Sequence, residues 1–80
     1  MEKRRMLELA KKGALAEIEK WDNRSRRALR KSIEAGQGIG NHSKTEAEYM
    51  EYHKKYEAKK EALEKEFEII DRLLFELDFE

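Results

Sequence analysis

The sequence predicts an all-α fold, an antiparallel hairpin of two long helices with the character of a coiled coil. A glycine cluster at residues 36–40 separates two long segments, and the chain contains no proline. In both segments apolar side chains recur at three- and four-residue spacing, as on one face of a helix. Eighty residues suffice for one domain, which we expect to span residues 1–80.

The first helix is expected over about residues 2–35. Its apolar stripe is lined mainly by small side chains, with Trp21 as the one large anchor, and Leu15, Leu29 and Ile33 widen it on one side. The glycines then favour a loop over residues 36–43, because glycine readily takes the left-handed conformation found at helix C-termini. The stripe consists of Leu7, Ala10, Ala14, Ile18, Trp21, Ser25, Ala28 and Ser32.

The second helix is expected over about residues 44–77. Ser43 with Glu46, or Thr45 with Glu48, matches the capping box that starts many helices, and the sequence does not decide between them. A strict seven-residue repeat follows, which is the signature of a coiled coil. The repeat consists of Tyr49, Tyr56, Leu63, Ile70 and Leu77, with His53, Lys60, Phe67 and Leu74 four residues after its first four members.

The two halves of the chain have opposite charge. Residues 1–40 hold eleven Lys and Arg against six Asp and Glu, and residues 41–80 hold seven against twelve. Folding at the glycine cluster brings together residues whose numbers sum to about 77, such as Trp21 and Tyr56. The same register predicts ion pairs of Lys11 with Glu66 and of Arg26 with Glu51, which favour the antiparallel arrangement.

A partner-binding surface is expected near the C-terminus, since the second helix carries more apolar side chains there than one neighbour covers. The partner is either a second copy, giving a four-helix-bundle homodimer, or a larger protein. Tyr52 is added as an aromatic at the rim of the helix pair. The candidate partner-binding residues are Ile69, Leu73, Phe75, Leu77, Phe79 and Tyr52.

Binding of nucleic acid is the alternative function. It would use the basic face of the first helix and the loop, where Arg24, Arg27, Lys31 and Lys44 are the candidate contacts to phosphates. The loop partly resembles a phosphate-binding P-loop. However, Ser43 replaces the second glycine, and a helix rather than a strand precedes it, so we expect an ordinary interhelical loop.

Chemistry-bearing motifs are scarce, and we expect a non-enzymatic protein without catalytic residues, metal or cofactor. The chain lacks cysteine, and its two histidines, His42 and His53, do not show metal-ligand spacing. No apolar run reaches the length of a membrane span, and no secretory signal is evident, so the cytoplasm is the expected location. Regulation or inhibition of a larger protein by occlusion suits such a chain, which has the general character of small phage proteins.

Overall fold

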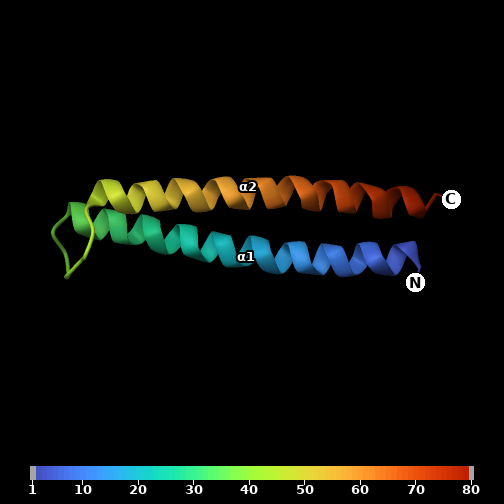
Figure 1. The fold of residues 1–80 in the computed structure, drawn as a ribbon, viewed down its shortest axis with the longest axis horizontal. Helices are drawn as coiled ribbons and strands as arrows, with labels where there is room; N and C mark the ends of the chain where they lie inside the picture. The colour runs from blue at the N-terminus through green and yellow to red at the C-terminus, as the bar shows by residue number, and fades with distance from the viewer. Residues whose placement is uncertain (1, 80) are drawn as a thin grey trace.

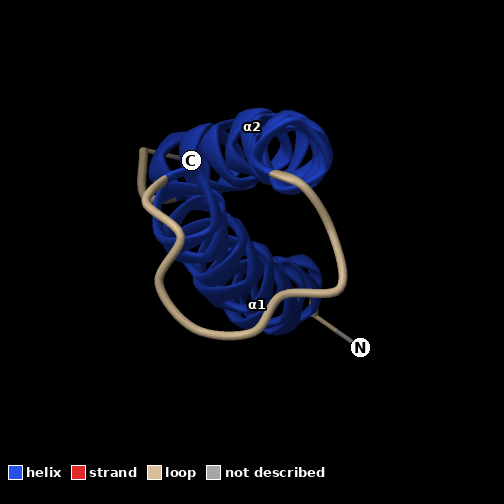
Figure 2. Ribbon diagram, turned by 90° about the vertical axis from the view of Figure 1, so that its left-hand side faces the viewer, coloured by secondary structure: helices blue, strands red, loops and turns tan. Residues whose placement is uncertain are grey.

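The computed structural model describes residues 2–79 and consists of two antiparallel α-helices, α1 (Lys3–Gly36) and α2 (Glu46–Leu77), joined by a loop (Figure 1). The rod is 58 Å long, and both termini lie at one end, here called the open end, opposite the loop end. Figure 2 shows the helices side by side, with the loop arching between them. The predicted all-α hairpin is confirmed, and helix α2 starts two residues later than expected.

Helix α1 ends in a Schellman motif, the hydrogen-bonded turn that caps many helices with a left-handed residue. The N–H of Gly38 donates to the carbonyl of Ala35 over 3.2 Å, and the N–H of Ile39 donates to the carbonyl of Glu34 over 2.9 Å. Gly38 has φ +70° and Gly40 has φ +75°, a region that side chains disfavour. These two glycines therefore make the reversal of the chain possible.

Helix α2 begins at a threonine cap. The Thr45 Oγ1 accepts a hydrogen bond from the N–H of Glu48 over 3.3 Å and donates to Glu48 Oε1 over 3.2 Å, so of the two predicted caps the structure uses Thr45. Ser32 of α1 donates to the carbonyl of Glu46 over 3.0 Å and ties the last turns of α1 to the first turn of α2. Hydrogen bonds therefore fix the loop at both of its ends.

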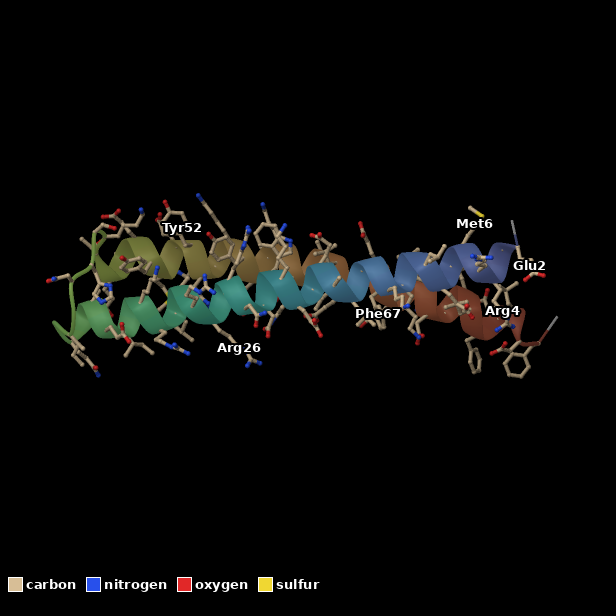
Figure 3. The ribbon with its side chains drawn as sticks, turned by 90° about the horizontal axis from the view of Figure 1, so that it is seen from below. Glu2, Arg4, Met6, Arg26, Tyr52 and Phe67 are labelled. Carbon is tan, nitrogen blue, oxygen red and sulfur yellow. The ribbon has the colours of Figure 1, made fainter. Side chains whose placement is uncertain are left out.

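The seam of α2 follows the predicted heptad repeat. Tyr49 is buried, and the other eight positions of the repeat are all half-buried, while most side chains between them are exposed. Figure 3 shows the two helices crossing at a shallow angle, as coiled-coil helices do. The seven-residue repeat therefore predicted which face of α2 meets α1.

The seam of α1 differs from the prediction at one position. Ala10 is exposed, and the half-buried residue at this level is Lys11, whose ammonium lies 5.5 Å from the centroid of the Phe67 ring. With Lys11 included, α1 shows the same heptad spacing as α2. The long lysine covers the aromatic ring better than an alanine methyl group would, and its charge still reaches solvent. Leu15 and Ile33, expected to widen the stripe, are also exposed.

The register agrees with the expected one, although the expected ion pairs do not form. The rings of Trp21 and Tyr56, whose numbers sum to 77, have centroids 5.6 Å apart. Lys11, however, pairs with Asp71 over 2.7 Å rather than with Glu66. Arg26 pairs with Asp22 of its own helix and not with Glu51. Long charged side chains can reach a partner one helical turn away along the rod. Ion pairs are therefore harder to predict from the register than contacts between packed rings.

Two glycine substitutions are expected to change stability in opposite directions. Gly38→Ala forces a side chain into the left-handed region and should destabilise the hairpin by about 1 kcal/mol. Gly13→Ala, within α1, should stabilise it by about 0.5–1 kcal/mol, because alanine loses less backbone entropy than glycine in a helix and the added methyl group meets nothing within 4 Å. Urea unfolding followed by circular dichroism compares the two variants, and equal shifts would contradict the assigned backbone roles.

Candidate functional site

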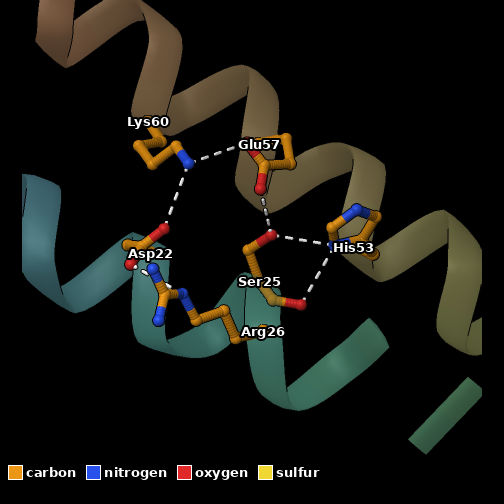
Figure 4. Close-up of polar contacts among 6 residues, drawn as sticks. All are labelled: Asp22, Ser25, Arg26, His53, Glu57 and Lys60. Carbon is orange, nitrogen blue, oxygen red and sulfur yellow. Dashed lines mark hydrogen bonds and ion pairs between the residues drawn. The ribbon is translucent and has the colours of Figure 1, made fainter. Parts of the chain in front are cut away.

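A polar cluster interrupts the seam at mid-length (Figure 4). The fully buried Ser25 of α1 donates its hydroxyl hydrogen to Glu57 Oε1 over 2.6 Å. The Nδ1 atom of His53 lies 2.8 Å from the Ser25 hydroxyl and 3.0 Å from the Ser25 carbonyl oxygen. Because a carbonyl oxygen only accepts, Nδ1 must carry the ring proton. Sequence reasoning placed Ser25 and His53 on their stripes but did not find this cluster.

The chemistry of this cluster is that of a structural contact. In serine hydrolases a histidine nitrogen accepts the serine proton. Here the histidine nitrogen is the donor, and the serine hydroxyl donates to the Glu57 carboxylate, so the serine–histidine proton transfer of those enzymes has no counterpart in this cluster. A buried polar layer of this kind favours one register over its neighbours, because any slip leaves its donors and acceptors unpaired.

Two charged groups extend the polar cluster to the surface. The Lys60 ammonium lies 3.1 Å from both Asp22 Oδ1 and Glu57 Oε2. Hydrogen bonds from Ser25 and then Lys60 lower the pKa of Glu57, and hydrogen bonds to Glu57 and Asp22 raise the pKa of Lys60. Glu57 therefore stays anionic and Lys60 cationic around neutral pH, and both remain paired.

A basic aromatic groove lies near the loop end, with a volume of about 340 Å³. It runs between the helices, and its floor and walls come from α1, the loop and α2. The four residues predicted to contact phosphates of a nucleic acid all line this groove, although they come from two separate segments of the chain. The basic aromatic groove is lined by Arg24, Arg27, Ala28, Lys31, Ser43, Lys44, Tyr49, Tyr52 and Tyr56.

A ladder of stacked aromatic rings borders the groove. Tyr52 stacks on Tyr56 with ring centroids 6.3 Å apart and planes 24° from parallel, and Tyr56 packs in turn against Trp21. Tyr49 forms another wall and is buried, whereas Tyr52 is 37% exposed. Figure 3 shows Tyr52 on α2 close to the loop end. Tyr49 and Tyr56 thus pack against α1 and line the groove with the same rings.

The groove has an excess of positive charge. Its lining residues, all within the described part of the chain, include four cations and no carboxylate. Between residues 2 and 79 none of these four cations takes part in an ion pair. Lys55 adds a further charge, with its ammonium 5.9 Å from the Tyr52 ring. The charge asymmetry of the sequence is therefore only partly neutralised by the fold.

The open end carries a second candidate surface made of apolar side chains. Six large apolar residues there are between 38% and 73% exposed. The Phe75 and Phe79 rings pack on each other, with centroids 4.8 Å apart, on the outside of α2. Figure 3 shows Met6 at this end of α1. The open-end apolar surface consists of Met6, Leu9, Ile69, Leu73, Phe75 and Phe79.

The predicted partner-binding residues do not all lie on one face. Ile69 and Leu73 form one line along α2, and Phe75 lies about a third of a turn away, with Phe79 just beyond the end of the helix. Leu77 is half-buried in the seam. Tyr52 lies about 30 Å from Leu73 along the helix, in the basic aromatic groove. Four of the six residues therefore belong to the open-end apolar surface.

Other kinds of site are not evident in the described part of the chain. Within residues 2–79 no group of histidine and carboxylate side chains is placed to hold a metal ion. Neither α1 nor α2 has a stretch long and apolar enough to cross a membrane. No family model matches the chain, and no curated protein or solved structure shows significant similarity to it.

Proposed function

We propose that the chain is a protein-interaction module whose open end associates with a second copy of itself. The observation that carries this proposal is the exposure of six large apolar side chains at one end of a two-helix rod. Exposed apolar clusters of this kind mark association surfaces, and two helices alone leave each other's outer faces in water.

The distribution of burial supports a second copy at this end. Five of the described residues are buried, and four of them, Ser25, Ala28, Ser32 and Tyr49, lie in the half nearer the loop. At the open end the seam is built from larger side chains, such as Leu7, that remain half-buried. A further pair of helices would complete the core where the hairpin leaves it open.

Charge complementarity favours a two-fold symmetric pair. Residues 3–12 of α1 carry five basic side chains and one acidic one, and residues 64–78, the end of α2 with its C-cap, carry six acidic and two basic ones. In a two-fold dimer, α1 of each copy packs beside α2 of the other, so the same favourable match occurs twice. Placing α1 beside α1 instead would bring like charges together.

We expect Leu73→Asp combined with Phe75→Asp to convert a dimer into a monomer. The aspartate at position 73 would have to lose its hydration at the interface, so the dimer should weaken by about 100-fold or more, and the aspartate at position 75 removes the second apolar line. Sedimentation velocity over a range of protein concentrations measures this change. The matched control is Ile33→Asp combined with Ile39→Asp, since these two exposed residues lie near the loop end. A wild-type chain that stays monomeric at every concentration would rule out the proposal.

Binding of a larger protein is the second candidate function. It is favoured by the two apolar lines on α2, because one neighbouring helix covers Ile69 and Leu73 and leaves Phe75 and Phe79 free. In this second candidate function, the hairpin would regulate or inhibit the larger protein by covering part of its surface. If it applies, the Leu73→Asp and Phe75→Asp variants lose the larger protein even where the wild type is monomeric.

A further inference from the structure

The basic aromatic groove is a separate surface from the open end, and its composition selects a kind of ligand. The four cations that line the groove take part in no ion pair within residues 2–79, and together they attract a polyanion. Arg24, Arg27 and Lys31 follow one another at three- and four-residue spacing along α1, which spreads them over about 10 Å. That length matches a short stretch of phosphate backbone rather than a single small anion.

The aromatic wall distinguishes among polyanions. The carboxylates of an acidic peptide and the headgroups of an anionic lipid surface do not stack on an aromatic ring. Every nucleic-acid base, in contrast, has a flat face that does. Tyr52 is held from behind by Tyr56, and its ring is flanked by the flexible side chains of Lys44 and Lys55. An exposed contact of this kind between an ammonium and a ring is weak, so a base displaces the lysines easily.

The form of the groove favours a single strand over a duplex. In a duplex the bases are already stacked on each other, and only a strand with free bases offers them to a protein ring. The volume of about 340 Å³ is at the lower end of the range for small-ligand sites, which suits one nucleotide unit. We propose that this groove binds single-stranded nucleic acid, with a base stacked on Tyr52 and phosphates on Arg24, Arg27, Lys31 and Lys44.

The proposal does not rest on self-association, because the groove lies within one hairpin. If the open ends also pair, two grooves point outward at the far ends of the dimer, and one strand that reaches both gains avidity. Each groove would still bind a short strand by itself.

Fluorescence anisotropy with a labelled single strand of mixed sequence, and with the matching duplex, tests the groove at several salt concentrations. If four phosphates are neutralised, the logarithm of affinity should fall with the logarithm of salt with a slope of about −3. Combining Arg24→Ala, Arg27→Ala and Lys31→Ala should reduce that slope by about 2 and weaken binding by about 100-fold near 0.1 M salt. The control of equal charge change is Lys20→Ala with Arg26→Ala and Lys54→Ala, three exposed residues that lie outside both the groove and the charged stretches at the open end.

The stacking step has its own pair of variants. Tyr52→Ala should weaken binding of the single strand by about tenfold, whereas Tyr52→Phe keeps the ring and should bind like the wild type. Circular dichroism verifies that each variant stays helical. Equal affinity for strand and duplex, or an unchanged affinity in Tyr52→Ala, would overturn the assignment to single strands. Binding of polyglutamate in place of nucleic acid, or no salt-sensitive binding at all, would overturn it as well.

Discussion

Ser25→Leu is expected to remove a large part of the stability of the hairpin. The serine is fully buried at the centre of the seam, so the larger leucine has no space and should cost about 1–3 kcal/mol through overpacking. Loss of the hydrogen bond to Glu57 adds about 1 kcal/mol. A chain of this size has roughly 4–12 kcal/mol in total, and this one buries few side chains. Urea unfolding followed by circular dichroism measures the loss.

Ser25→Ala separates the two contributions to that loss. Alanine removes the hydroxyl group without adding volume, so its cost should be limited to about 1 kcal/mol for the hydrogen bonds. His53 and Glu57 are only half-buried and regain water when the serine hydroxyl is gone. Equal destabilisation by leucine and alanine would mean that the helices separate there without cost, contrary to the full burial of Ser25 between them.

The fold was predictable because local and long-range patterns in the sequence agree. The heptad repeat of α2 identified every position of its seam from Tyr49 to Leu77. Gly38 and Gly40 marked the place where the chain reverses, since both take positive φ there. Small residues on α1 faced large ones on α2, as with Ala28 and Tyr49, and this matching fixed the register.

Polar details were less predictable, for physical reasons. Lys11 replaces Ala10 in the seam because a long side chain covers Phe67 with its methylene groups, and a hydropathy pattern does not register this. Ser25, His53 and Glu57 come from two helices, and their hydrogen bonds depend on side-chain torsions that residue spacing does not determine. The choice between Ser43 and Thr45 as the N-cap of α2 depends on the backbone geometry of the loop, and the structure has Thr45 at that position.

The candidate groove was half-predicted. The four cations were identified as one group from their charge, and the structure brings them together. The tyrosines were interpreted as core residues because they recur at helical spacing. In a two-helix rod most positions of the seam remain partly exposed to solvent. An aromatic side chain such as Tyr56 therefore both packs against Trp21 and lines a groove. In a compact protein with several layers, different residues would pack the core and line a surface groove.

Trp21→Ala is the second substitution expected to have a large effect, with a loss of about 2–3 kcal/mol. The indole is half-buried, packs on Tyr56 at 5.6 Å between centroids, and has the Lys59 ammonium 4.3 Å from its own ring. Trp21→Phe keeps a ring against Tyr56 and should lose only about 1 kcal/mol. Far-UV circular dichroism in urea is the suitable measurement, since the alanine variant has no tryptophan fluorescence.

The same substitution links the core of the hairpin to its groove. Tyr56 is held between Trp21 and Tyr52, so removing the indole leaves Tyr56 free to tilt and withdraws the support behind Tyr52. We therefore expect Trp21→Ala to weaken single-strand binding while its salt slope stays at the wild-type value, because the groove cations are unchanged. An altered slope with unaltered affinity would instead indicate that the indole positions Arg24, whose guanidinium lies 4.8 Å from the indole ring.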